Sequence, residues 1–348
     1  MKKKLSMILT SLLLVISLVA CSNDKKVDSN TNSRKEAEVL AKVAVLKGPT
    51  SMGMVEMMQE AKEDQKEKDN DKEKDDKDYE FNIVNSVDEI VPKIVNKDLD
   101  MAAVPSNVAS VLYNKTKGNV DTLAINTLGI LYIVENGNSV KNISDLKGKH
   151  IYSSGKGATP QYALDYILRG NGIDPEKDVK VEYKSEHTEV LSALMNDKNA
   201  IAVLPQPFVT VAQEKDKNLN VAIDFNKEWD KLNKDSKDKS KMITGVLVVR
   251  KDFADKYPEK VKDFMEDYKE SIEFTNKNID KAAKLIGQFN IVPEAVAKKA
   301  IPHCNITYID GQEMKNNLSA YLKILYDANP KSIGGKMPGE DFYYIQKN

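Results

Sequence analysis

Three loops of this sequence carry residues suited to holding a small anion. They are segments 47–53, 105–107 and 153–160, and each follows a short apolar run and precedes a stretch with helical spacing. Glycine lets a backbone approach a ligand closely, and the free N–H groups and dipole at a helix start favour a carboxylate, sulfonate or phosphate. One such loop is usually an ordinary helix start, but three at equivalent places predict a binding site.

We expect the ligand to contact these loops and a fourth segment, 205–208, which also follows an apolar run. The candidate contacts are Gly48, Pro49, Thr50, Ser51, Met52, Ser106, Asn107, Ser154, Gly155, Gly157, Ala158, Thr159, Gln206, Pro207 and Phe208. Trp229 joins them because charged residues surround it in the sequence, which makes a core position hard to explain. Aromatic rings suit a planar ligand, and Tyr132, Tyr152 and Tyr162 are further candidates. Lys47 and Lys156 lie in the loops, and whether either contacts the ligand stays open.

Catalytic, metal and nucleotide motifs do not accompany these loops in the sequence. Gly155 and Gly157 are followed by Pro160 where a dinucleotide fingerprint needs its third glycine, and no phosphate-loop Gly-Lys-Ser/Thr ending is present. The histidines of the chain are His150, His187 and His303. No two of them have metal-ligand spacing. We therefore expect no catalytic residue, no metal and no cofactor.

The elements that must position the loops alternate between apolar β runs and helical stretches. β runs are expected at 43–46, 81–84 and 99–104, then as one long run at 123–135 containing Gly129. A second series follows, with runs at 150–152, 179–183, 200–204, 221–223 and 245–249. From Tyr257 to the Gly334–Gly335 region the pattern is helical throughout. This alternation predicts an α/β fold with parallel-type sheets covered by helices, and ligands at the carboxyl ends of the strands.

Composition bounds the partners. The 348 residues include 52 Lys+Arg against 53 Asp+Glu, giving a net charge of −1, with 41% hydrophobic and 30% charged residues. These values exclude a disordered chain, a coiled-coil rod and a multi-pass membrane protein. They also leave no large basic surface for nucleic acid. The arginines are Arg34, Arg169 and Arg250, so a cluster of guanidinium groups around a di-anion is not expected.

The N-terminus has the anatomy of an export signal. Three lysines at 2–4 precede an apolar stretch at 7–20, which is short for a bilayer span. Leu18-Val19-Ala20-Cys21 resembles the lipobox of bacterial lipoproteins. We expect residues 1–20 to be removed, Cys21 to be lipidated and 21–40 to form a flexible tether. Cys304, the second cysteine, then has no disulfide partner.

Beyond the lipobox, the chain resembles a family from about residue 42 to 344. The matching segments are 45–50, 145–149, 155–160, 204–208, 244–251, 329–335 and 341–344. Together and in this order they resemble the substrate-binding lipoproteins of bacterial ABC transporters, and among these the nitrate/sulfonate/taurine and thiamine-precursor group. The combination is typical of the superfamily and is not specific for one ligand.

The resemblance implies a two-lobed periplasmic-binding-protein type 2 fold with two crossover strands. Lobe one would comprise 41–130 and 243–348, and lobe two 131–242. The protein would be a monomer, anchored by lipid on the outer side of the cell membrane. It would deliver a sulfonate, a thiamine-precursor-like pyrimidine or another small heterocycle to a membrane permease, without chemistry.

Two other classes stay open. An enzyme of the same fold that makes the thiamine pyrimidine would carry a Cys-rich iron motif, which this sequence lacks. A ligand-sensing surface lipoprotein is the other alternative.

Overall fold

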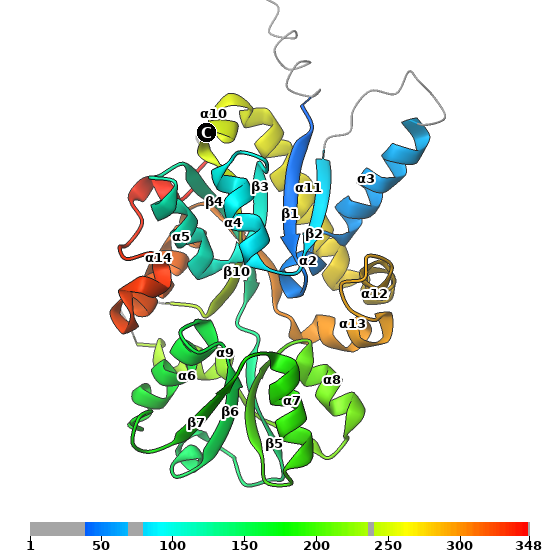
Figure 1. Cartoon of the computed structure of the whole chain (residues 1–348). Helices are drawn as coiled ribbons and strands as arrows, with labels where there is room; N and C mark the ends of the chain where they lie inside the picture. The colour runs from blue at the N-terminus through cyan, green and yellow to red at the C-terminus, as the bar shows by residue number, and fades with distance from the viewer. Residues whose placement is uncertain (1–38, 69–78, 236–239, 347–348) are drawn as a thin grey trace, which may run out of the picture.

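Two sheets organise the residues that the computed structural model describes, which are 39–68, 79–235 and 240–346 (Figure 1). We call the unit built on the six-stranded sheet lobe one and the unit built on the five-stranded sheet lobe two. The mixed α/β class expected from the alternating pattern is confirmed, because buried apolar strands in both sheets alternate with helices along the chain.

Lobe one has the strand order β11-β4-β10-β3-β1-β2. The bounds are β1 Ala41–Leu46, β2 Tyr79–Val84, β3 Met101–Pro105, β4 Val120–Leu128, β10 Ile243–Arg250 and β11 Ile306–Asp310. β1 pairs in parallel with β2 and β3, whereas β10 runs antiparallel to both β3 and β4. The sheet therefore joins strands from both ends of the described chain, with β10 at its centre.

Lobe two has the strand order β7-β6-β8-β5-β9. The bounds are β5 Leu131–Asn136, β6 His150–Ser154, β7 Lys180–Lys184, β8 Ile201–Pro205 and β9 Leu219–Asp224. β6 is parallel to β7 and β8, and β5 is antiparallel to β8 and β9. Its helices are η1 Ile143–Leu146, α6 Thr159–Gly170, α7 His187–Asn196, α8 Phe208–Lys215 and α9 Phe225–Leu232.

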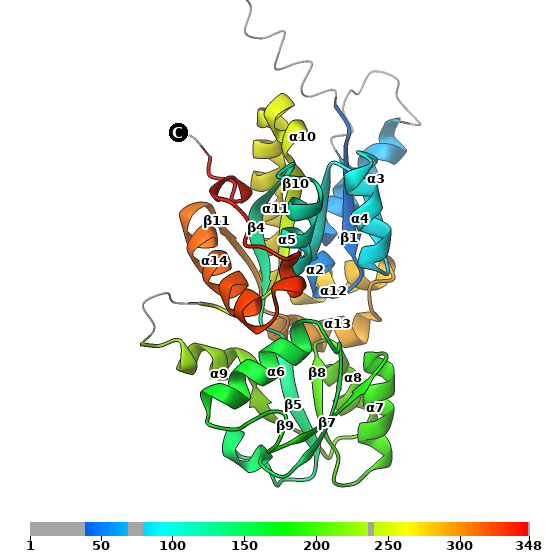
Figure 2. The same cartoon turned by 60° about the vertical axis from the view of Figure 1, so that its left-hand side comes forward.

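Helices cover the lobe-one sheet on both faces (Figures 1 and 2). One apolar cluster packs the sheet against α3 Val55–Lys68, α11 Pro258–Lys277, α12 Ile279–Gln288 and α13 Glu294–Ala300. On the other face lie α4 Val87–Val95, α5 Ser106–Lys115 and α14 Gly311–Ala328. The remaining elements are α2 Pro49–Met52, α10 Lys251–Lys256, η2 Ile301–His303, η3 Pro330–Ile333 and η4 Glu340–Phe342. The second cluster continues into lobe two through α6 and α9, so the lobes share an apolar core on this side.

The described strands require two crossings between the lobes. Residues 129–130 join β4 to β5, and the segment after α9 returns to β10. A Cβ atom at Gly129 would lie 2.8 Å from Asn226 Oδ1 and 2.9 Å from Met242 Sδ, so the two connections lie side by side here. The single β run expected at 123–135 is therefore two strands in different sheets, divided at the glycine.

The uninterrupted helical pattern expected after Tyr257 is wrong at one place. β11 interrupts it and pairs with β4, covering the edge of the lobe-one sheet. Its sequence, Ile-Thr-Tyr-Ile-Asp, is rich in β-branched and aromatic residues, which favour a strand. Helical segments on both sides, α13 with η2 before it and the long α14 after it, hide this five-residue signal from an interpretation based on periodicity.

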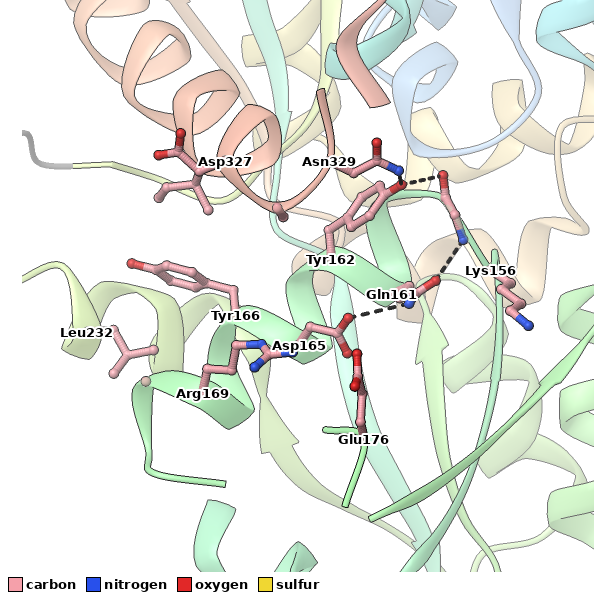
Figure 3. A pocket seen from close by; sticks show the side chains of 14 residues that line it. Lys156, Gln161, Tyr162, Asp165, Tyr166, Arg169, Glu176, Leu232, Asp327 and Asn329 are labelled. Atoms are coloured by element: carbon pink, nitrogen blue, oxygen red, sulfur yellow. Dashed lines mark hydrogen bonds between the residues drawn. The ribbon is translucent and has the colours of Figure 1, made fainter. Parts of the chain in front are cut away.

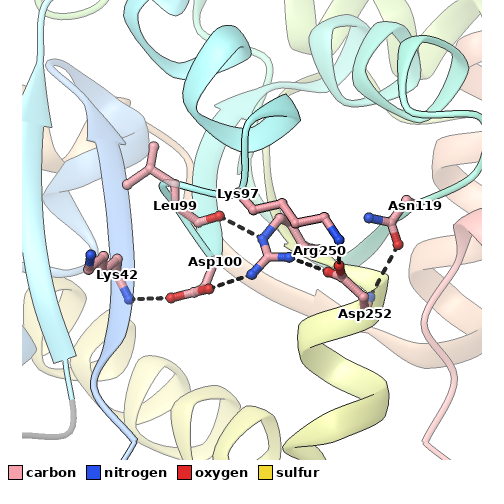
Figure 4. Close-up of polar contacts among 7 residues, drawn as sticks. All are labelled: Lys42, Lys97, Leu99, Asp100, Asn119, Arg250 and Asp252. Carbon is pink, nitrogen blue, oxygen red and sulfur yellow. Dashed lines mark hydrogen bonds and ion pairs between the residues drawn. The ribbon is translucent and has the colours of Figure 1, made fainter.

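An arginine network pins β10 at the end of the sheet far from the crossovers (Figure 4). Arg250 Nη2 lies 2.8 Å from Asp100 Oδ1, and Arg250 Nε donates to the Leu99 carbonyl at 2.9 Å. Asp100 Oδ2 accepts from the backbone N–H of Lys42 at 2.9 Å, and Asp252 also contacts the guanidinium group. One buried side chain thus ties together the starts of β1 and β3 and the end of β10.

Candidate functional site

The strand directions bring the predicted loops to one edge of each sheet. In lobe one, β1 and β3 are parallel neighbours, so the segments after Leu46 and Pro105 leave the sheet at the same edge. β10 enters at that edge, since Gly245 pairs with Pro105, and β4 leaves there toward lobe two. Segments 47–53 and 105–107 therefore lie on the side from which the crossovers run.

Lobe two has the matching arrangement. The carboxyl ends of β6, β7 and β8 lead directly into α6, α7 and α8, and β5 starts beside the end of β8, where Leu131 pairs with Pro205. Figure 1 places α2 at the lower end of lobe one and α6 and α8 at the upper end of lobe two. The loop-bearing edges of the two sheets thus face each other.

A cavity of about 430 Å³ lies at the strand ends of lobe two. Its lining residues are Ser154, Gly155, Ala158, Pro160, Ser185, Glu186, His187, Thr188 and Phe208. Four of the predicted contacts are among them. Gly155 has φ +71°, a left-handed conformation that suits glycine, and this turns the chain from β6 toward α6. The cavity combines a backbone turn, a hydroxyl group and an aromatic ring.

His187 is one of the lining residues that the sequence reasoning did not name as contacts, together with Ser185, Glu186 and Thr188. Its Nδ1 lies 2.6 Å from Ser154 Oγ, and its ring centroid lies 5.1 Å from that of Phe208. Burial lowers the pKa of His187, against the opposing charge of Glu186. The missed signal is that His187 begins a helix directly after a strand, which is the same arrangement that marked the other loops.

Other predicted lobe-two contacts lie elsewhere. The Gln206 side chain is buried, and its Oε1 accepts a 2.8 Å hydrogen bond from Thr210 Oγ1. Pro207 is buried beside it. Thr159 is the first residue of α6 and lies near the Tyr321 hydroxyl. Burial raises the pKa of that hydroxyl, and Thr159 lowers it in part. The two groups do not meet at full hydrogen-bond geometry. Thr159 therefore borders the apolar contact between the lobes.

A larger cavity of about 1110 Å³ runs between α6 and the end of α14 (Figure 3). Gly157 and Lys156 line it, together with charged side chains of α6. Here Asn329 Nδ2 donates to the Tyr162 hydroxyl at 2.9 Å, and that hydroxyl donates to the Gly157 carbonyl at 3.0 Å. This chain of hydrogen bonds joins lobe one to the loop of lobe two. The larger cavity lies along the flank of α6, so we place the candidate site in the smaller one at the strand ends.

In lobe one, the predicted polar side chains are bonded to carbonyl groups. Thr50 Oγ1 donates to Leu46 at 3.1 Å, and Ser51 Oγ donates to Gly48 at 2.8 Å. In the same way Ser106 Oγ donates to Ile243 at 2.7 Å, and Asn107 Nδ2 donates to Ser332 at 3.2 Å. Met52 is buried in the core, while Gly48 and Pro49 are partly exposed. Because their donors are used in these bonds, the four side chains stabilise the loops at this edge and have fewer donors left for a ligand.

Asn126 is a second residue that the sequence reasoning missed. It lies on β4 next to the crossover and is 1% exposed. Its Oδ1 accepts from Thr127 Oγ1 at 3.0 Å, but its Nδ2 meets no partner among the described residues. A buried donor without a partner is costly, and the polar group beside it is the buried Tyr268 hydroxyl, whose pKa Asn126 lowers against the effect of burial.

The expectation that Trp229 lies in the cleft because a core position is unlikely was wrong. Trp229 is 0% exposed, and its ring packs at 4.3 Å from Tyr166 and 5.4 Å from Tyr321. Its Nε1 donates to Ser240 Oγ at 3.3 Å. α9 is strongly amphipathic, so Phe225 and Trp229 face inward while the charged neighbours face solvent. Charge in the neighbouring sequence positions therefore says little about the burial of one helical residue.

Two α/β lobes joined by two crossovers, with facing strand-end loops, define a binding protein of the periplasmic type 2 fold. The model of the family described as "ABC transporter, phosphonate, periplasmic substrate-binding protein" matches residues 72–297. The chain belongs to this family, whose members are substrate-binding components of ABC transporters. No curated protein matches the chain by sequence.

Solved structures share the fold. An ABC transporter protein from Parabacteroides distasonis is 21% identical with a TM-score of 0.71, over 88% of this chain and 99% of that one. The aliphatic sulphonate binding protein SsuA from Escherichia coli is 14% identical with a TM-score of 0.66, over 89% and 94%. A putative sulfonate-binding SsuA from Methylobacillus flagellatus is 15% identical with a TM-score of 0.62, over 89% and 92%.

The described residues contain no helix long and apolar enough to cross a membrane. Cys304 is buried and forms no disulfide with any of them. Cys21, the predicted lipidation site, lies outside the described residues.

Proposed function

We propose that this chain is the lipid-anchored solute receptor of an ABC importer and that it captures a small organic oxyanion between its lobes. The ligand is a sulfonate or phosphonate with a short apolar substituent. Capture is reversible and involves no reaction. The receptor then presents the closed, loaded form to a membrane permease, as the family assignment supports.

The cavity at the ends of β6, β7 and β8 is the observation that carries this proposal. The N-terminal ends of α6, α7 and α8 follow these strands, and the N-terminal end of a helix favours negative charge. Ser154 adds a hydroxyl group, and Gly155 and Ala158 keep the backbone accessible. With no Arg in the cavity lining, this surface suits a compact, singly charged oxyanion.

The Phe208 ring supports an organic ligand over an inorganic ion. It lies at the start of α8 and lines the same cavity as Ser154. An apolar substituent on the oxyanion would pack against this ring, which gives affinity that sulfate or phosphate lacks. The sulfonate-binding proteins of similar fold from Escherichia coli and Methylobacillus flagellatus add support for this class.

A planar heterocycle such as a thiamine-precursor pyrimidine is the second candidate. The close pair of His187 and Phe208 rings favours it, since aromatic rings stack on flat ligands. This candidate leaves the three helix starts without a matching charge, so we rank it below the oxyanion.

A thermal-shift screen separates the two candidates. The panel is methanesulfonate, ethanesulfonate, methylphosphonate, sulfate, phosphate and an aminomethylpyrimidine, and hits are followed by calorimetry. We expect the organic oxyanions to raise the melting temperature and bind at micromolar affinity or tighter, roughly −8 kcal/mol. Stabilisation by the pyrimidine alone would replace the oxyanion with the heterocycle. Conversion of any compound to a product would move the chain to the enzyme class.

The anchor has its own test. We expect the mature protein to begin at a lipidated Cys21, because Leu18-Val19-Ala20-Cys21 follows an apolar segment. Mass spectrometry of the N-terminal peptide from membranes decides this. An unmodified Cys21 inside an intact signal would contradict it. Cellular uptake of the bound compound, measured with and without the gene for this chain, separates a transport receptor from a sensing lipoprotein. Loss of uptake in the deletion strain supports the receptor.

A further inference from the structure

The hydrogen bond between Ser154 and His187 has two possible directions. When Nδ1 of His187 carries no proton, the serine hydroxyl must donate to it, and Ser154 Oγ can then only accept a hydrogen bond from a ligand. When Nδ1 carries a proton, it donates to Ser154 Oγ, and the serine O–H is free to donate elsewhere. The 2.6 Å separation of the two atoms makes one of these arrangements obligatory.

We propose that His187 is a positioning residue that decides, through the proton on Nδ1, whether Ser154 offers the ligand a donor or an acceptor. An oxyanion needs the donor, so its binding favours the Nδ1-protonated ring. This inference rests on the proposed function for its ligand class. It assigns to His187 a role in selecting ligand charge that works through Ser154.

The surroundings of His187 leave its protonation sensitive to a ligand. Of the residues that line the cavity, His187 and Glu186 are the two with ionisable side chains. Burial lowers the pKa of His187, and the charge of Glu186 opposes this only in part. α8 contributes the uncharged Phe208 ring. Lys184, at the end of β7, is bonded to Glu182 at 2.6 Å, and Lys156, on the loop before α6, is exposed.

Coupling between anion binding and protonation of His187 fixes the direction in which affinity changes with pH. A neutral ring can supply Nδ1–H by moving its proton from Nε2, so the linked proton comes from the charge of the anion, which favours the imidazolium. The bound anion raises the pKa of His187 relative to the free protein, and binding takes up a proton between the two pKa values. Affinity for an oxyanion therefore increases as the pH falls through this window. One linked proton limits the change to tenfold in Kd per pH unit.

Calorimetry from pH 8.5 to 5.0 with ethanesulfonate tests this, because the charge of that probe is constant over the range. For the wild type we expect tighter binding at low pH, with proton uptake visible in buffers of different ionisation enthalpy. His187→Asn is the matched variant, since its amide N–H can take the place of Nδ1–H at every pH. It should bind with a pH-independent Kd. His187→Phe keeps a ring against Phe208 but cannot hydrogen-bond to the Ser154 hydroxyl. At low pH it should bind ethanesulfonate severalfold more weakly than the wild type.

Nitrogen NMR of the histidine side chains in the ligand-free protein is the second arm, and it does not depend on the ligand. His150 and His303 serve as internal references. We expect Nδ1 of His187 to be unprotonated at pH 8, and Ser154→Ala to change the pKa or tautomer of His187 while both references stay unchanged. Melting curves confirm that the variants fold.

The outcomes separate the two proposals. If no oxyanion binds the wild type at any pH, the proposed function fails, and the NMR arm still decides whether Ser154 and His187 are coupled. If ethanesulfonate binds with the same Kd at every pH in wild type and His187→Asn, or if Ser154→Ala leaves the His187 titration unchanged, the positioning role is overturned while the proposed function stands.

Discussion

At the scale of single residues, the Arg250 network holds a buried ion pair in lobe one (Figure 4). Replacing Arg250 by Met would keep most of the side-chain length but leave the Asp100 carboxylate buried without its counter-charge. Breaking a buried ion pair from one side costs about 3–5 kcal/mol. We expect the free energy of unfolding to fall by that amount, measured by urea denaturation with an unchanged m-value.

Lys97→Met is the control for this variant. It removes an ion pair to Asp252 in the same network, but the Lys97 side chain is 61% exposed. Exposed pairs contribute about 0–1 kcal/mol, so we expect little change in stability. Equal losses in Arg250→Met and Lys97→Met would show that burial of the pair does not matter.

Asp121 gives a pH-dependent contribution to stability. Burial raises its pKa to about 6, against the attraction of Lys251, whose Nζ lies 3.5 Å from Oδ2. The folded state therefore holds a proton that the unfolded state releases near pH 4. Stability from this group is present below that pH and is lost as the pH rises to about 6, a loss of about 2–3 kcal/mol. Asp121→Asn should flatten this part of the stability–pH profile and be the more stable protein at pH 8. Parallel profiles for the variant and the wild type would argue against the raised pKa.

At the scale of elements, α9 joins the apolar cores of the two lobes. The Trp229 ring packs between Tyr166 of α6 and Tyr321 of α14. Trp229→Ala opens a cavity there, and truncation of a buried tryptophan costs about 3–5 kcal/mol. Thermal or urea unfolding measures the loss. Lys231→Ala, on the exposed side of the same helix, should cost less than about 1 kcal/mol. A Trp229→Ala protein as stable as Lys231→Ala would be inconsistent with the packing described.

The elements also show what sequence patterns can predict here. Apolar runs followed by helix starts predicted the α/β class and the edges where Ser154 and Phe208 lie, because period and turn chemistry are local signals. β11 was missed because its five-residue strand signal lies between helical segments and because its partner, the edge of β4, is a tertiary feature. His187 carried the same local signal as the other loops, a helix start after a strand, but its pairing with Ser154 depends on a residue distant in the sequence. Trp229 was placed wrongly because its charged neighbours were weighed above the helical period that turns it toward Tyr321.

At the scale of the whole molecule, the Tyr162 hydroxyl links the lobes through Asn329 and Gly157 (Figure 3). Tyr162→Phe keeps the ring but removes the hydroxyl group, and with it the hydrogen bond to Asn329 that crosses between the lobes, whereas the bond to Gly157 lies within lobe two. At about 0.5–1.5 kcal/mol for one net hydrogen bond, the arrangement with the lobes in contact should lose several-fold in population. We expect a larger radius of gyration by small-angle X-ray scattering of the ligand-free protein, and weaker binding of an oxyanion probe.

Lys299→Met is the matched control for this variant. It breaks another contact between the lobes, the 2.8 Å pair of Lys299 and Glu214, which lies on the surface. Its effect on closure should be small because water screens the charges. A larger change in radius of gyration with Lys299→Met than with Tyr162→Phe would show that the contact between α13 and α8 controls closure, and not the contact between Tyr162 and Asn329.

The central place of β10 in lobe one has a consequence for the order in which the chain assembles. The described strands of lobe two lie between residues 131 and 224, whereas β3 and β4 acquire their shared neighbour only when residues 243–250 arrive. A ribosome or a secretion channel releases the N-terminal part first, so lobe two can complete its sheet while β3 and β4 still carry open edges. Open edges invite pairing with other chains. The arrival of β10 closes the facing edges of β3 and β4, and the hazardous interval of biosynthesis then ends when β11 covers the remaining edge of β4.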